Sequence, residues 1–126
     1  MINQIKLPIK VESRNVLDRQ HWAVKRRHKQ QYQLLIRNQM RLNKVQKTEP
    51  QKYQLIITSY RKRMLDHDNL VGGCKHLIDA LFNELFIWDD SPKFLSTPII
   101  RQVKNSKEEF TFIERIPVED NSKKTE

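Results

Sequence analysis

The stretch 65-LDHDNLVGGCKHLIDALFNELFIWDDSPK-93 joins the strongest helical pattern of the chain to its densest group of acidic residues. From Lys75 to Ile87, apolar residues recur as adjacent pairs at four-residue intervals, which predicts an amphipathic helix with a broad apolar face. Four aspartates flank this segment: Asp66 and Asp68 before it, and Asp89 and Asp90 after it. We therefore expect a helix with carboxylates near both of its ends.

Strand patterns lie on both sides of this stretch. Met1–Val11 alternates loosely around Pro8, which suits an edge strand, and Lys52–Tyr60 is rich in β-branched and aromatic residues. Ile99–Val103 and Phe110–Ile116 are separated by a polar turn, so we predict that these two strands form a hairpin.

A long basic segment precedes the central strand. Gln20–Val45 lacks Gly and Pro and predicts a helix, whereas the polar Ser13–His21 predicts a connection. Nine Lys or Arg residues and no acidic residue lie between Arg19 and Lys47. Such a run is either a solvated helix face or a surface for a phosphate backbone. The absence of acidic partners for (i, i+4) pairs favours the phosphate backbone.

The candidate DNA contacts come from this helix and from the end of the central strand. They are Lys25, Arg26, Arg27, Lys29, Arg37, Arg61, Lys62 and Arg63. Trp22 is interpreted as a core anchor, and His21 and His28 as surface residues.

The composition limits the class of protein. The chain has 126 residues, a net charge of +9 and one cysteine, and its apolar stretches are shorter than the roughly 20 residues that span a bilayer. We expect a single domain over residues 1–118 and a disordered tail over 119–126. The fold class predicted is α+β, a small mixed sheet with two main helices. With no leader and no disulfide pair, a cytoplasmic location without a membrane role is expected. The charge favours nucleic acid as partner, although other basic proteins share it.

The acidic residues favour a divalent cation. Asp66 and Asp68 would point to one face of an extended segment and repel each other unless a cation lies between them. Carboxylate oxygens without a Cys or His cluster suit Mg²⁺ or Mn²⁺ rather than zinc. Such an ion can activate water towards a phosphodiester, and Lys75 can balance the charge that develops on the phosphate.

Each of these residues also has a structural interpretation. Asp68 or Asn69 can cap a helix, and Asp89 and Asp90 can form a polar turn before Pro92. Lys75 can be an ordinary exposed helix residue, the glycines Gly72 and Gly73 can serve a loop or close packing, and Cys74 is interpreted as a packed or loop residue rather than a nucleophile. The combination within one short window of a basic chain favours a functional site.

Three blocks within residues 50–95 resemble the RusA family of Holliday-junction resolvases. They are Asp66-His67-Asp68-Asn69-Leu70, then Lys75 with Asp79-Ala80-Leu81, and then Trp88-Asp89-Asp90. The order matches the family pattern D-x-D-N-L, K-x-x-x-D-A-L and D-D. One departure is an excess of about three residues between Asn69 and Lys75, close to one helical turn. Lys75 keeps its orientation if this segment is helical, and loses it if the glycines open a turn.

The resemblance implies a RusA-like homodimer that binds branched DNA, specifically four-way junctions, and makes paired Mg²⁺-dependent nicks in recombination and repair. It implies that Asp66, Asp68 and Asp90 hold the metal, that Asp89 assists, and that Lys75 contacts the scissile phosphate. Two other functions stay open. One is a non-catalytic DNA-binding relative, and the other is a Mg²⁺-dependent nuclease of flaps, forks or RNA.

Overall fold

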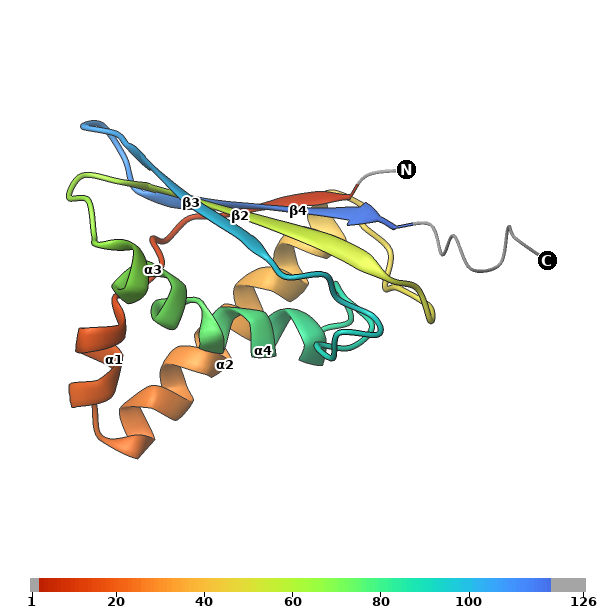
Figure 1. The fold of residues 1–126 in the computed structure, drawn as a ribbon, viewed down its shortest axis with the longest axis horizontal. Helices are drawn as coiled ribbons and strands as arrows, with labels where there is room; N and C mark the ends of the chain where they lie inside the picture. Colours follow the sequence, from red (N-terminus) through yellow and green to blue (C-terminus); the bar gives the residue numbers. More distant parts are fainter. Residues whose placement is uncertain (1–2, 119–126) are drawn as a thin grey trace.

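A computed structural model describes residues 3–118, in which helices cover one face of a four-stranded mixed sheet (Figure 1). The elements in chain order are β1 (Gln4–Leu7), α1 (Arg14–Arg19), α2 (Trp22–Leu42), β2 (Tyr53–Arg61), α3 (His67–Gly73), α4 (Lys75–Asn83), β3 (Ile99–Lys104) and β4 (Phe110–Pro117). This mixed architecture is consistent with the predicted α+β class. The predicted tail over 119–126 lies outside the described residues.

The sheet has the order β1-β4-β2-β3, so β2 separates the two last strands. β2 pairs parallel with β3 and antiparallel with β4. Both predicted strands therefore form, but the prediction that they pair as a hairpin is wrong. The polar turn between them crosses the end of β2, where the Asn105 N–H donates to the Arg61 carbonyl at 2.8 Å.

Two helices precede the central strand. The predicted connection over Ser13–His21 contains α1, which begins where the Ser13 hydroxyl accepts from the Val16 N–H at 3.2 Å. α2 follows and buries Tyr32, Ile36 and Met40 at four-residue intervals. Trp22 stands at its exposed start with 67% of its surface accessible, so its interpretation as a core anchor is wrong.

α3 and α4 return the chain along the sheet from the end of β2 to the start of β3 (Figure 1). Their buried Leu70, Leu77 and Leu81 join the residues of β2 in one hydrophobic cluster. α4 ends at Asn83, four residues before the predicted end. Leu85 adopts a φ of 59°, which turns the chain and directs the buried Phe86 back into the core.

The glycine pair lies inside α3 and serves close packing. A Cβ atom on Gly73 would lie 1.9 Å from the Glu12 carbonyl oxygen, and one on Gly72 would meet the Arg14 side chain at 2.5 Å. Neither glycine has a positive φ. The segment between Asn69 and Lys75 is therefore helical. Of the two alternatives that the sequence left open, a helical segment or a turn at the glycines, the structure shows the first.

Candidate functional site

Asp66 and Asp68 stand at the exposed start of α3. Asp66 occupies the position before the first helical residue, yet its carboxylate caps no backbone N–H. It accepts instead from the Asn69 side-chain amide at 2.6 Å. Asp68 lies in the first turn and is exposed. The structure therefore uses neither carboxylate as a helix cap, and both face solvent.

A side chain from β3 fixes the approach to this pair. The Gln102 amide donates to the Leu65 carbonyl at 2.6 Å, and its oxygen accepts from the Leu65 N–H at 3.0 Å. Gln102 pairs with Ser59 in β2. The residue before Asp66 is thus held at the carboxyl end of β2.

Lys75 follows Asp68 by seven residues, which is about two helical turns. Cys74 joins α3 to α4 with right-handed helical angles, φ −79° and ψ −8°. Lys75 is exposed and begins α4, so the junction between two helices separates it from Asp68 in α3.

Asp89 and Asp90 lie in the loop after α4. The Asp89 carboxylate accepts from the Asp90 N–H at 2.7 Å and from the Ser91 hydroxyl at 3.3 Å, so it stabilises a polar turn. The turn leads to Leu95, which bridges to Tyr53 at the start of β2. Asp90 is exposed beside it.

The two acidic pairs lie at opposite ends of β2. From Tyr53 to Ser59 the strand rises by about 20 Å, at roughly 3.3 Å per residue. In the described part of the chain, no three His, Cys, Asp or Glu residues are grouped to hold a metal ion. Within one chain, the structure therefore does not bring Asp90 beside Asp66 and Asp68, the residues expected to share a metal site with it.

The eight predicted DNA contacts divide into three kinds. Arg26, Arg27, Lys62 and Arg63 are exposed, and Lys25 is partly exposed. Lys29 lies 4.0 Å from Asp79, and Arg37 donates twice to Glu84, at 2.8 and 3.2 Å. The hydrogen bond from Glu84 raises the pKa of Arg37. These two cations are already paired with acids.

Arg61 is neither exposed nor paired with an acid: it is a buried cation, and its predicted role in DNA contact is wrong. Its side chain is 3% exposed, and its guanidinium donates to the Val11 carbonyl at 2.8 Å and to the Arg63 carbonyl at 2.7 Å. These bonds tie β2 to the segment between β1 and α1. Arg61 is therefore a structural cation.

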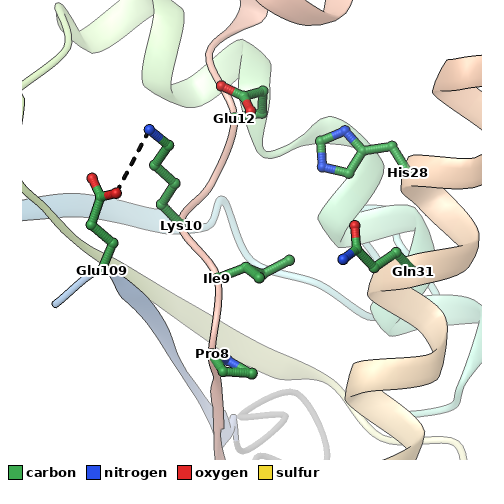
Figure 2. A pocket seen from close by; sticks show the side chains of 7 residues that line it. All are labelled: Pro8, Ile9, Lys10, Glu12, His28, Gln31 and Glu109. Carbon is green, nitrogen blue, oxygen red and sulfur yellow. Dashed lines mark ion pairs between the residues drawn. The ribbon is translucent and has the colours of Figure 1, made fainter.

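The sequence did not point to a polar hollow between the segment after β1 and α2 (Figure 2). Its volume is about 470 Å³, and it is lined by Pro8, Ile9, Lys10, Glu12, His28, Gln31 and Glu109. Lys10 pairs with Glu109 at 3.8 Å, and His28 stacks on the buried Tyr32. Burial lowers the pKa of His28. These residues are scattered in the sequence and form no motif.

Cys74 is buried, and this burial raises the pKa of its thiol to about 12. A thiol with such a pKa is protonated at neutral pH and is a poor nucleophile. Its interpretation as a packed residue is confirmed.

Comparison with models of known protein families finds none that matches this chain, and comparison with curated proteins finds no match either. Among the described residues, no helix is both long and apolar enough to cross a membrane.

Proposed function

We propose that this protein is a Mg²⁺-dependent endonuclease that resolves four-way DNA junctions. The observation that supports the proposal best is the exposed carboxylate pair, Asp66 and Asp68, which caps no helix and stands between cationic residues. Lys62 and Arg63 precede the pair in the chain, and Lys75 follows it at the start of α4; all three are exposed. A pair of acids within a cationic surface fits a cation that bridges protein to phosphate.

The donor set suits Mg²⁺. This ion is commonly held by one or two carboxylates together with water and substrate phosphate oxygens, so Asp66 and Asp68 supply enough protein ligands. Bound there, Mg²⁺ would provide an activated water and polarise the phosphodiester. The Asn69 amide orients the Asp66 carboxylate, and Lys75 balances charge on the phosphate.

Asp89 and Asp90 take part in this proposal only through a second copy of the chain. Since they lie at the other end of β2, a two-fold dimer can bring Asp90 of one copy to Asp66 and Asp68 of the other. A dimer then has two equivalent sites, as paired nicks in two symmetric strands require.

The test is cleavage of a synthetic four-way junction beside duplex, fork, flap, single-strand and RNA controls, with Mg²⁺ or EDTA. We expect paired nicks confined to the junction and abolished by EDTA. Asp68→Asn should lose cleavage and keep or tighten junction binding, because a repelling charge is removed. Asp18→Asn, an exposed acid on α1 with a single long ion pair at 3.5 Å, is the matched control and should cleave normally.

The separation of the acidic pairs within one chain favours a second candidate, a DNA-binding protein without catalysis. Tight junction binding with no cut under Mg²⁺ or Mn²⁺ would establish that candidate and refute the nuclease. Equal cutting of forks, flaps or RNA would instead refute the junction preference.

Mixed dimers test the contribution of the second copy. Asp68→Asn and Asp90→Asn subunits should each be inactive alone. After mixing, about half of the dimers carry one intact site, so about a quarter of the nicking activity should return. No recovery from subunits that exchange would show that Asp90 does not complete the site of the partner.

A further inference from the structure

Trp22 presents an aromatic ring to solvent at the first position of α2. It is 67% accessible, whereas Phe82 is 36% accessible. The buried side chains of α2 are Tyr32, Ile36 and Met40, so Trp22 lies outside the packed part of the helix. Exposure of one apolar side chain is common in proteins. The neighbours of Trp22 therefore decide what its ring can do.

His21 supports the ring of Trp22 from one side. The His21 Nδ1 accepts from the Ala23 N–H at 3.2 Å and caps α2, so the imidazole is fixed to the first turn of the helix. Its ring centroid lies 5.4 Å from that of Trp22, at an interplanar angle of 39°. The indole thus leans on a ring that is itself anchored. A contact surface that is ordered before binding loses less conformational entropy on binding.

The residues on the same side of α2 as Trp22 are cationic. Side chains three, four and seven positions apart share one side of a helix, and here these positions hold Lys25, Arg26 and Lys29. Lys29 reaches Asp79 of α4 at 4.0 Å. Within residues 3–118, neither Lys25 nor Arg26 forms an ion pair with an acid. Trp22, Lys25 and Arg26 therefore form a stripe of one aromatic ring and two unneutralised cations.

The stripe lies at the same end of the molecule as the candidate site. α1 packs against α3, and α2 begins close behind α1, so Figure 1 shows α1, α3 and the beginning of α2 together. Burial lowers the pKa of His76 in α4, against the opposing charge of Asp79. Lys25 and Lys29 add to this lowering of the pKa, so their charges lie near the start of α4, where Lys75 also lies.

We propose that Trp22 is a stacking platform for an unpaired nucleobase, and that Lys25 and Arg26 bind the phosphates on either side of that base. Proteins that bind single-stranded nucleic acid combine the same two features, since bases stack on aromatic rings while the backbone follows the positive charges. A base inside a paired duplex is covered on both faces by its neighbours, so Trp22 favours bases that are unpaired. The inference rests on the proposed function only in taking that base from the branch point of a DNA junction.

The pattern along α2 favours a nucleobase over a lipid surface. Helices that lie on anionic membranes also carry Trp, Lys and Arg, but they bury a continuous apolar face. On α2 the positions beside Trp22 are charged. Val24 and Leu34, two other exposed apolar residues, point about 200° and about 120° away from Trp22 around the helix. A single ring among cations fits one base and its phosphates.

Tryptophan fluorescence tests the stacking directly. Trp88 is the only other tryptophan of the chain, so Trp88→Phe leaves Trp22 as the sole source of tryptophan emission. The titrations are carried out in EDTA, so that Mg²⁺-dependent cleavage does not interfere. We expect strong quenching when oligothymidylate saturates the protein, because the indole then stacks on a base. A long duplex should bind and leave the emission nearly unchanged.

Affinities of surface variants test the two roles separately. Trp22→Ala should weaken the binding of oligothymidylate about tenfold, as expected for one lost base–aromatic stack, and keep the affinity for long duplex. Trp22→Phe should recover most of the loss. Lys25→Ala/Arg26→Ala should weaken single strands and duplex alike and reduce the salt dependence of binding. Leu34→Ala removes a 53% accessible side chain from the same helix and is the matched control, with wild-type binding expected.

A wild type that does not bind oligothymidylate at low salt overturns the proposal. So does unchanged Trp22 emission at saturation, or a Trp22→Ala variant that binds oligothymidylate as tightly as wild type. Emission that responds to phosphatidylserine vesicles and to no DNA overturns it in favour of a membrane surface. Trp22-dependent binding of oligothymidylate by a protein that cuts no junction keeps the platform and removes the proposed nuclease. Paired nicks at junctions, with oligothymidylate binding unaffected by Trp22→Ala, keep the nuclease and remove the platform.

Discussion

Gly73→Ala is expected to destabilise the protein strongly, although alanine is the better helix former. The new Cβ would lie 1.9 Å from the Glu12 carbonyl oxygen and 3.0 Å from its carbon. An ordinary contact needs at least 3.4 Å, so α3 must shift by about 1.5 Å away from the segment before α1. Both partners are backbone and cannot simply rotate away.

The magnitude follows from two opposed terms. Inserting a methyl group into a packed contact costs about 3 kcal/mol at the upper end of the usual range, which a backbone clash justifies. Alanine recovers about 1 kcal/mol of helix propensity relative to glycine. The free energy of unfolding should therefore fall by about 2 kcal/mol.

Gly72→Ala provides the matched control one residue earlier. The atoms nearest to its Cβ belong to the exposed Arg14 side chain, whose Cδ at 2.5 Å can rotate away at the cost of a weak surface pair with Asp18. The Arg14 Cβ at 2.9 Å needs a further shift of a few tenths of an ångström. The stability of Gly72→Ala should stay within about 1 kcal/mol of wild type. Urea unfolding followed by circular dichroism measures both variants. Equal stabilities for the two alanine variants would refute close packing as the reason for the pair.

Three further outcomes follow from the buried groups. Arg61→Met should lose about 2–3 kcal/mol because the buried Val11 carbonyl and the partly buried Arg63 carbonyl lose their donor, whereas the exposed Arg63→Met should change stability by about 0.5 kcal/mol or less in urea unfolding. Burial lowers the pKa of His28 and of His76 from 6.5, so the unfolded chain takes up protons first on acidification. Stability measured from pH 7 to pH 5 should fall, and it should fall less in His28→Gln/His76→Gln; an unchanged slope would contradict this. Cys74 should react with a thiol reagent only at the rate of unfolding, and rapid labelling of the folded protein at pH 8 would contradict its burial.

Local patterns predicted the elements of this fold well where periodicity was strong. The strands over Tyr53–Arg61 and Phe110–Pro117 lie within a residue of the predicted ends, and so does the start of α4 at Lys75. α1 was missed because its single buried residue, Leu17, leaves no periodic pattern in six residues. The signal was the Ser13 hydroxyl, a preferred N-cap whose effect depends on the geometry of the chain around it.

Residue type misled the prediction where tertiary context decides. Trp22 is large and apolar, but it begins a helix whose buried face starts later, and it stays exposed. In the sequence, Arg61 belongs to one continuous basic run with Lys62 and Arg63. The inner-face position at the end of β2 buries Arg61, while its two neighbours leave the strand for solvent. The run of basic residues therefore predicted a positively charged surface, but it did not predict which of these residues lie on that surface.

The failed hairpin and the divided acidic site have one cause. β2, the two helices and β3 form a parallel crossover unit, in which the chain leaves one end of the first strand and enters the next strand at the opposite end. Residues that precede the helices, such as Asp66, must lie at the carboxyl end of β2. Residues that follow them, such as Asp90, must lie at its amino end. Acidic residues that lie close together in the sequence are therefore separated by the length of the strand in the fold.

The same crossover places β3 at the sheet edge, since β4 occupies the other side of β2. A chain of this topology does not unite Asp66, Asp68 and Asp90 by itself, so in the proposed nuclease a second copy would have to bring Asp90 to the other two acids. Catalysis through all three acids thus requires the dimer. If Asp90→Asn still cuts junctions in Mg²⁺, then Asp66 and Asp68 act without Asp90, and a second copy serves only to pair the nicks.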